Sequence, residues 1–249
     1  MDIPGAPRQG RGGPPPAPPW LARREPAGRR VGKSPLSREL IVDTALAVLD
    51  RDGVSAMTMR RVAQELSTGP ASLYAHVANL RDLEDLVFDR VAAELTVPEP
   101  DPAHWQEQLR EMLVQAVLVL RRHPGVARYA LGRVPFGEHA LDFSDAMLGL
   151  LRVGGVPDQA AAWAVDVIGL FIAAAGYEEA IRQDEGMTED SVHQWTGQFA
   201  EFLAGLPEQR YPNTVRLAAE MATGSADERL RFGVQMLVAG LAATAVAKP

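Results

Sequence analysis

The side chains best suited to bind another molecule lie between residues 58 and 77, in TMRRVAQELSTGPASLYAHV. This stretch reads as two short helices joined by a tight turn. Thr58 is a good N-cap for the first helix, because its side-chain oxygen can accept a hydrogen bond from an unpaired backbone N–H. The residues at 67–69 interrupt the helical pattern. Pro70 is typical of the first position of the next helix, where a missing N–H costs nothing.

The second of these helices has an apolar face and a face of small and polar side chains. Leu73 and Val77 are four residues apart and therefore share the apolar face. Small residues lie opposite them and two larger ones lie on the flanks, namely Ala71, Ser72 and Ala75 with Tyr74 and His76. A helix this short is unstable alone in water. The pattern predicts a helix-turn-helix that presents its second helix to the major groove of DNA.

Two longer helices are expected on either side of this pair. The first spans about 37–52, ends at Gly53, and has an apolar stripe of Ile41, Ala45, Val48 and Leu49. The other spans about 79–95 and carries Leu83, Leu86, Val87 and Val91. The proline-rich segment TVPEPDP at 96–102 ends it and marks a domain boundary.

Residues 37–95 resemble the DNA-binding domain of tetracycline-repressor-like (TetR/AcrR) transcriptional regulators. The resemblance rests on IVDTALAVLDRDG at 41–53, on Thr58-Met59-Arg60-Arg61, and on Leu73-Tyr74-x-His76-Val77. A weaker resemblance to the ligand-binding domain of the tetracycline repressor rests on RRHPG at 121–125, Gly-Tyr-Glu-Glu-Ala at 176–180, Phe232-Gly233 and Gly240-Leu241. It implies an all-α fold and a dimer whose recognition helices change spacing when a small molecule binds.

The resemblance also implies a set of DNA contacts. Arg60 and Tyr74 match phosphate contacts, while Ser72 and His76 match contacts to base edges or phosphate. Pro70, Ala71 and Ala75 lie where relatives approach the groove, and Arg81 lies near a phosphate contact. Three positions depart from the pattern: Ser67 replaces a glycine, Ala75 replaces a larger side chain, and Leu80 replaces a lysine. Packing within the domain is the alternative role for Tyr74 and His76.

Charge is distributed unevenly along the chain. The net charge is −7, yet residues 1–34 contain seven Arg and Lys against Asp2 and Glu25. This segment is also rich in proline and glycine, so we expect a disordered basic tail. The expected organisation is a tail at 1–34, a DNA-binding domain at 35–95 and a ligand-binding and dimerisation domain at 96–249. The tail either contacts DNA or serves only solubility.

The remainder of the chain shows helical periodicity throughout. Helices are expected near 103–122, 124–132, 138–152, 157–183, 188–205, 212–223 and 226–246. The long helix at 157–183 has a stripe of larger residues, Trp163, Val167, Leu170, Ala174, Tyr177 and Ile181, beside a stripe of small ones, Gly169, Ala173, Gly176 and Ala180. The last helix has a similar pattern. Two helices that are apolar on more than one face fit either a two-fold dimer interface, with the small stripe at the contact, or the centre of a monomer core.

No pattern of an enzyme or a metal site is evident. The five histidines are scattered, cysteine is absent, and neither H-E-x-x-H nor a phosphate-binding glycine loop occurs. We therefore assign no catalytic residue, no metal and no cofactor. Nine residues are candidates for the lining of a ligand pocket, although each is also a plausible core or interface residue: Trp105, Met112, Phe136, Phe143, Met147, Trp163, Asp166, Phe171 and Tyr177.

The sequence thus predicts an all-α, cytoplasmic, homodimeric regulator that binds an operator in double-stranded DNA and is released by an unknown small-molecule effector. No signal-peptide core is present, and the most apolar run, 167–177, is too short to span a bilayer. The alternative is a helical small-molecule-binding protein without specific DNA binding, which the acidic body, Ala75 and Leu80 favour.

Overall fold

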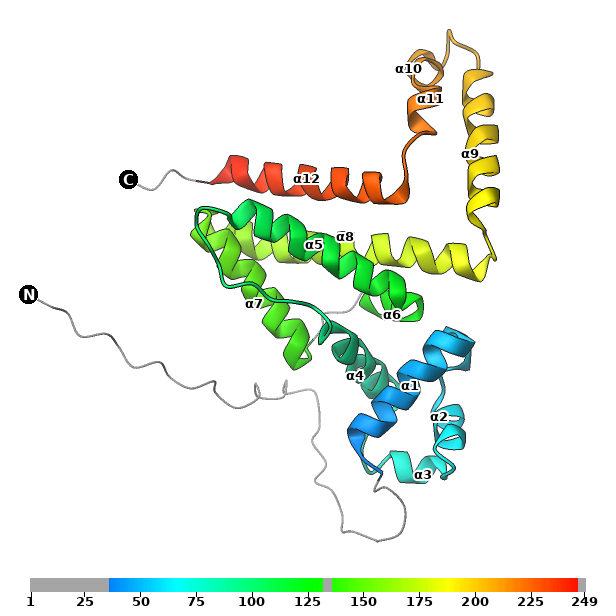
Figure 1. Ribbon diagram of the computed structural model, residues 1–249, viewed down its shortest axis with the longest axis vertical. Coiled ribbons are helices and arrows are strands. Elements are labelled where there is room, and N and C mark those ends of the chain that lie inside the picture. Colours follow the sequence, from blue (N-terminus) through cyan, green and yellow to red (C-terminus); the bar gives the residue numbers. More distant parts are fainter. Residues whose placement is uncertain (1–35, 132–135, 246–249) are drawn as a thin grey trace, which may run out of the picture. The chain divides into compact units, whose positions relative to one another are not determined.

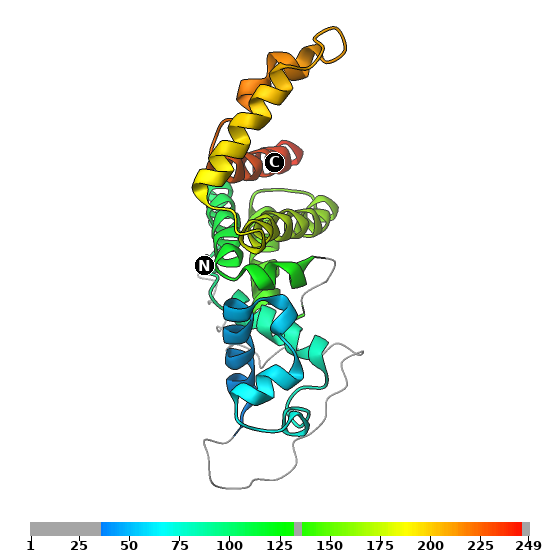
Figure 2. The same ribbon diagram turned by 90° about the vertical axis from the view of Figure 1, so that its right-hand side faces the viewer.

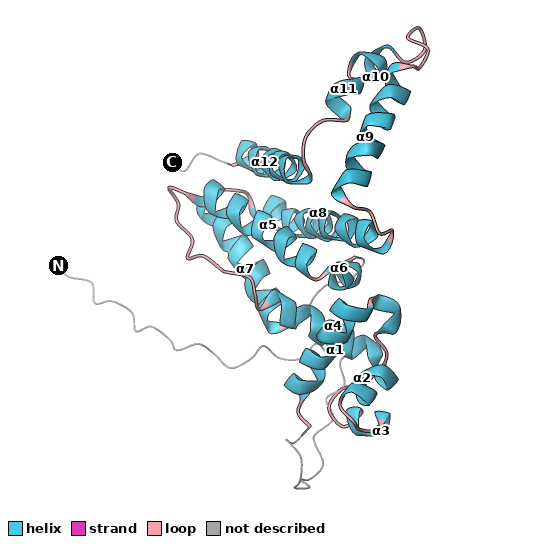
Figure 3. Cartoon of the chain, turned by 45° about the vertical axis from the view of Figure 1, so that its right-hand side comes forward, coloured by secondary structure: helices cyan, strands magenta, loops and turns pink. Residues whose placement is uncertain are grey.

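The computed structural model describes residues 36–131 and 136–245, and every regular element within these ranges is a helix (Figure 3). The chain divides into two compact units. The first contains Met1–Ala93 and Val134–Asp142, and the second contains Glu94–Arg133 and Phe143–Pro249. The predicted all-α fold is confirmed. The basic tail at 1–34 lies outside the described residues.

The first unit contains the helix-turn-helix (Figure 1). Its elements are α1 (Arg38–Asp52), the 3₁₀ turn η1 (Val54–Ala56), α2 (Met59–Glu65), α3 (Pro70–Leu73), α4 (Leu80–Ala92) and the start of α7 (Glu138–Val153). The predicted core stripe of α1 is confirmed, because Ile41, Ala45, Val48 and Leu49 are at most 1% exposed. Leu83 and Val87 of α4 are fully buried as well.

Local hydrogen bonds explain where these helices begin and end. The Oγ1 of Thr58 accepts from the Arg61 backbone N–H at 3.1 Å, which confirms the predicted cap of α2. Asn79 caps α4 in the same way, accepting from the Asp82 N–H at 3.0 Å. Gly53 ends α1 with φ +80°, a conformation that glycine adopts without a steric penalty.

The second unit is built around α8. Its elements are α5 (Trp105–Arg122), α6 (Pro124–Ala130), the remainder of α7, α8 (Asp158–Asp184), α9 (Glu189–Ala204), α10 (Pro212–Arg216), α11 (Ala218–Met221) and α12 (Ala226–Thr244). Helix α8 packs against α5, α6 and α12, while α10 and α11 fold back on α9 (Figure 2). The single helix predicted at 212–223 is wrong, because Leu217, with φ −105° and ψ 15°, separates α10 from α11.

The orientation of α8 corrects the prediction about its small residues. Gly176 is buried, and a Cβ added to it would lie 2.7 Å from the Cβ of Leu120 and 3.3 Å from that of Ala127. Ala173 is only 2% exposed, whereas Gly169 faces open space and the side chain of Ala180 is not described. The small residues at 173 and 176 therefore let α5 and α6 approach within the same chain, and they do not form an outer contact surface.

Candidate nucleic-acid interface and ligand domain

The turn between α2 and α3 is closed by two backbone hydrogen bonds. The N–H of Ser67 donates to the carbonyl of Gln64 at 3.0 Å, and the N–H of Thr68 donates to that of Ala63 at 2.9 Å. This is the Schellman arrangement, which requires a left-handed residue just after the helix. Ser67 fills that position with φ +50°, the one positive φ outside glycine in the described ranges. The glycine expected at this position is thus replaced at some cost in backbone strain.

One side of helix α3 is buried against the rest of the first unit, and the opposite side is open to solvent. The helix is shorter than predicted, because it ends at Leu73 and a turn follows. Leu73 is nevertheless fully buried and Val77, just after the turn, is 2% exposed, so both face inward as their spacing predicted. The opposite side is solvent-exposed, with Tyr74 46% exposed and His76 half-buried at one flank. The predicted DNA-facing residues Pro70, Ala71, Ser72 and Ala75 are all exposed on this side. The structure therefore brings together a small, presented surface that is poor in hydrogen-bond donors.

The three arginines around this surface differ in their surroundings. Arg60 at the start of α2 and Arg81 at the start of α4 are exposed, and neither side chain has a hydrogen bond or ion pair among the described residues. Arg61 is instead paired with Asp52 at 2.9 Å and with Glu65 at 2.8 Å. The charge of Arg61 is therefore already neutralised within the chain.

A second arginine completes that acidic cluster. Arg51 contacts Asp52 at 2.7 Å and Glu65 at 2.5 Å, so two cations face two carboxylates between α1 and α2. Hydrogen bonds from Arg51 and then Arg61 hold the pKa of the Asp52 carboxyl well below its ordinary value. The cluster fastens α2 to the end of α1 and leaves little net positive charge at this corner.

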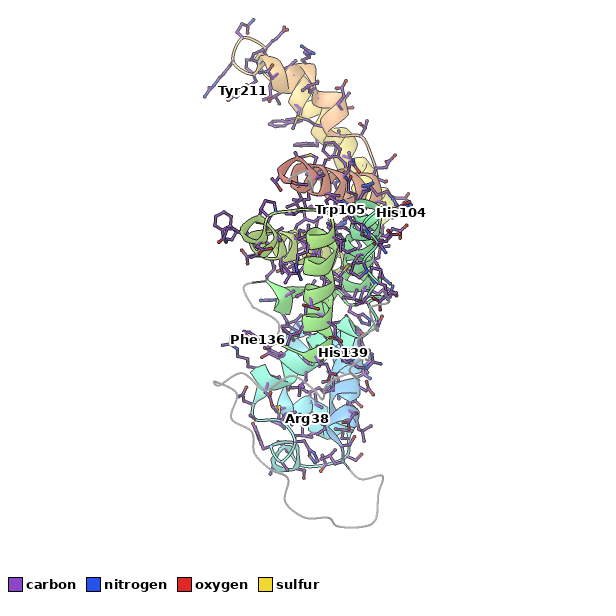
Figure 4. All side chains as sticks on the ribbon, turned by 90° about the vertical axis from the view of Figure 1, so that its left-hand side faces the viewer. Arg38, His104, Trp105, Phe136, His139 and Tyr211 are labelled. Atoms are coloured by element: carbon purple, nitrogen blue, oxygen red, sulfur yellow. The ribbon has the colours of Figure 1, made fainter. Side chains whose placement is uncertain are left out.

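Sequence reasoning missed Arg38, which lies at the start of α1 (Figure 4). Its Nε donates to the backbone carbonyl of His76 at 3.2 Å, across 38 residues of sequence. The side chain is exposed, and its remaining N–H groups have no hydrogen-bond partner among the described residues. A cation in the first turn of a helix opposes the helix dipole, so its position there was the available signal for a role outside α1.

The nine candidate pocket residues do not gather in one place. Trp105, Met112, Phe143 and Met147 are buried in the second unit, on α5 and α7. Phe171 and Tyr177 of α8 are half-buried. Phe136 belongs to the first unit and is 39% exposed. Trp163 and Asp166 lie on the exposed side of α8.

That exposed side of α8 is strongly apolar. Trp163 is 67% exposed, Val167 50% and Leu170 52%, which places the predicted stripe of larger residues on the outside. Helix α12, which lies beside α8, exposes Phe232 (66%) and Met236 (58%). The segment Asp158–Glu178 is long and apolar enough to cross a membrane by length and composition, although a buried or interface helix of a soluble protein meets the same criterion.

Comparison with known proteins identifies the class. The sequence matches the family model described as bacterial regulatory proteins, tetR family, over residues 41–83. It matches that of the tetracyclin repressor-like C-terminal domain over residues 97–245. The chain belongs to the TetR family of transcriptional regulators. It is a ligand-responsive, DNA-binding regulator of the repressor type.

Individual relatives cover most of the chain. The HTH-type transcriptional repressor DrrR1 of Streptomyces coeruleorubidus is 30% identical over 86% of this chain and 81% of its own length. An HTH-type transcriptional regulator of Saccharopolyspora erythraea is 34% identical, with 84% and 86% covered. The structure of Streptomyces coelicolor ActR with actinorhodin is 40% identical, with a TM-score of 0.79, and the match covers 86% of this chain and 99% of that one. ActR has also been solved with (S)-DNPA.

Proposed function

We propose that this chain acts as a homodimer that binds a palindromic operator and releases it when a small molecule binds in the second unit. The observation that carries the proposal is the presented helix α3, held by the buried side chains of Leu73 and Val77 and preceded by the tight turn at Ser67. A recognition helix of this length reads few bases, so two copies on two half-sites are needed for specificity. The cytoplasm, where the chromosome of a bacterium lies, is the place of action.

The DNA contacts proposed for each half-site come from four elements. Arg60 and Tyr74 contact phosphates, and Ser72 and His76 contact base edges or phosphates. The methyl groups of Ala71 and Ala75 suit thymine methyl groups. The exposed guanidinium groups of Arg38 and Arg81 add further phosphate contacts. The surface of α3 is thinly charged, so these cations supply most of the affinity.

The outer surface of α8 and α12 is the proposed dimer interface. Exposed aromatic and aliphatic side chains on two adjacent helices are unfavourable in water and favour burial against a second copy. A two-fold axis brings α8 and α12 of one copy against α8 and α12 of the other. A two-fold dimer is the commonest closed assembly. We therefore assign Trp163 and Asp166 to this interface rather than to a pocket.

The proposed effector site lies among α5, α7 and α8, where Trp105, Met112, Phe143 and Met147 supply a buried apolar lining, with Phe171 and Tyr177 at its side. The likeness to ActR, whose solved complexes contain actinorhodin and (S)-DNPA, supports these two molecules as the first probes. No catalytic step and no cofactor is part of the proposal.

Selection of binding sites from random duplex DNA tests the proposal. The full chain is expected to enrich one palindrome and to bind it with two protomers per site. Actinorhodin or (S)-DNPA is then expected to weaken that binding. A protein that binds the small molecules but enriches no sequence would instead be a helical small-molecule-binding protein, and the DNA-binding proposal would be wrong.

A further inference from the structure

The segment that connects α4 to α5 is fastened along α5 by three polar side chains. Gln108, Gln115 and Arg122 are spaced by seven residues, which corresponds to two helical turns, so they lie on one face of α5. Each of the three contacts a different part of the connector, which comprises residues 94–101. The contacts follow in reverse order along the two segments, so the connector runs antiparallel to α5.

Both glutamines make paired hydrogen bonds to the connector. The Oε1 of Gln115 accepts from the Thr96 N–H at 3.1 Å, and its Nε2 donates to the Thr96 Oγ1 at 3.1 Å. The Oε1 of Gln108 accepts from the Asp101 N–H at 2.9 Å, and its Nε2 donates to the Glu99 carbonyl at 2.8 Å. Side-chain amides thus replace the secondary-structure partners that this extended segment lacks.

The third contact lies where the connector leaves α4. Arg122 donates to Glu94 at 2.7 Å, and a ring nitrogen of His123 lies 3.2 Å from the same carboxylate. The Arg122 hydrogen bond, followed by the charge of His123, lowers the pKa of Glu94. Only Ala93 separates Glu94 from Ala92, the last residue of α4. The end of α4 is therefore tied covalently, within two residues, to a point fixed on α5.

The connector itself is stiff. Prolines occur at 98 and 100, and each fixes its own φ and favours an extended conformation for the residue before it. A free segment of eight residues could reach across more than about 25 Å and would absorb a small displacement of α5 without moving α4. A stiff segment that is bound to α5 at three points cannot absorb such a displacement.

We propose that Gln108, Gln115 and Arg122 are positioning residues of the switch, which convert the connector into a strap that passes displacement of α5 to the C-terminal end of α4. This inference rests on the proposed release of DNA by an effector. Helix α5 is suited to start the movement, because the buried pocket candidates Trp105 and Met112 lie within one helical turn of Gln108 on the adjoining part of its surface. The strap carries the coupling between the two binding sites, and neither site needs it for its own affinity.

The mechanical part is tested without any ligand. In the double variant Gln108→Ala/Gln115→Ala, amide hydrogen exchange is expected to speed up across 94–101 and in the last turn of α4, and to stay unchanged in α1. Gln106→Ala is the matched control, because Gln106 is exposed on the same helix and has no hydrogen bond through its side chain among the described residues. Equal exchange in the last turn of α4 in both variants would overturn the strap, whatever the effector is.

The functional part compares operator binding with and without saturating actinorhodin, the probe named above. Allosteric coupling between two sites typically changes affinity 5–150-fold. The double variant is expected to bind the operator in the absence of actinorhodin, and to bind actinorhodin itself, with wild-type affinity. The factor by which saturating actinorhodin weakens operator binding is expected to be at least about fivefold smaller than in the wild type. Full release in the double variant would overturn the proposal. Failure of the wild type to respond would count against the proposed function, while the exchange experiment still decides the strap.

A third variant separates coupling from folding. Gln115→Glu keeps an acceptor for the Thr96 N–H and can accept from the Thr96 hydroxyl, so it is expected to restore release to near the wild-type level. If the double variant is too unstable, Gln115→Ala alone replaces it, with Gln115→Glu as its rescue. Loss of release in both Gln115→Ala and Gln115→Glu would mean that the hydrogen bonds to Thr96 are not the cause.

Discussion

Two neighbouring arginines at the start of α2 have different surroundings. Arg60 is exposed without a partner among the described residues, whereas Arg61 is bound by Asp52 and Glu65. Arg60→Ala is expected to weaken binding about equally on all DNA sequences and to lower the salt slope by roughly one unit. Arg61→Ala should leave the slope nearly unchanged. Titration of operator binding across a salt series measures both, and identical slopes for the two variants would contradict this docking.

Arg38 tests whether a residue of α1 also takes part in DNA binding. Because its Nε already holds the His76 carbonyl, the remaining N–H groups are available for a phosphate. Arg38→Ala is expected to reduce both operator affinity and the salt slope, while Arg38→Lys keeps the charge and the slope but loses the planar hydrogen-bond geometry. The same salt series applies. A slope that is unaffected by Arg38→Ala would limit Arg38 to holding the end of the recognition segment.

Ser67 is a residue whose backbone conformation suits glycine better. A side chain at φ +50° destabilises the folded state by about 1 kcal/mol. Replacing it with glycine removes this strain, but glycine also gives the unfolded chain more conformational freedom, which cancels part of the gain. Ser67→Gly is therefore expected to raise the free energy of unfolding by up to about 1 kcal/mol. Ser72→Gly, placed in the exposed helix α3, should lower it by about 0.5–1 kcal/mol. Denaturant unfolding measures both, and a lower stability of Ser67→Gly would show that the serine side chain is needed.

At the scale of a single element, α8 has an outer and an inner face that can be tested separately. Leu170→Glu places a charge on the exposed apolar side, and burying it unpaired across a two-fold interface should cost about 3 kcal/mol or more. Sedimentation is expected to show monomers, and the helix content of the variant is expected to stay unchanged.

Gly176→Leu is the matched change on the inner face of α8. It meets the Leu120 Cβ within the same chain and should lower the free energy of unfolding by about 1–3 kcal/mol without selectively splitting the dimer. Thermal unfolding measures the loss of stability expected for Gly176→Leu, and sedimentation measures the loss of the dimer expected for Leu170→Glu. An intact Leu170→Glu dimer would place the interface elsewhere.

For the whole molecule, the distribution of charge matters more than its sum. The chain carries −7, while residues 1–34 carry seven cationic and two acidic residues. Such a tail, a few residues before the DNA-binding domain, can enter the minor groove or lie over phosphates. Deletion of 1–33 is expected to weaken operator binding and flatten its salt dependence, with dimerisation and effector affinity unchanged. Equal affinity of the full-length and truncated proteins at every salt concentration would leave the tail without a role in binding.

Local signals in the sequence determined the helices and the presented recognition element. Thr58, Gly53 and Pro70 mark helix ends through their own backbone and side-chain chemistry, and the spacing of Leu73 and Val77 selects the buried side of the recognition segment. These features depend on residues a few positions apart, so they can be predicted without the fold. The motif that carries the family resemblance is built from the same short-range pattern.

Tertiary structure alone decided which face of α8 turns inward, because apolar side chains and small residues each suit both a core and an interface. It also decided that Arg61 is neutralised, that Arg38 reaches His76, and that three residues of α5 hold the connector. Most of these contacts join residues that lie between 7 and 56 positions apart in sequence, as for Gln108 with Asp101 and for Gly176 with Leu120. Periodicity predicts which residues share a face of a helix, but only the packing of neighbouring segments determines what each face contacts.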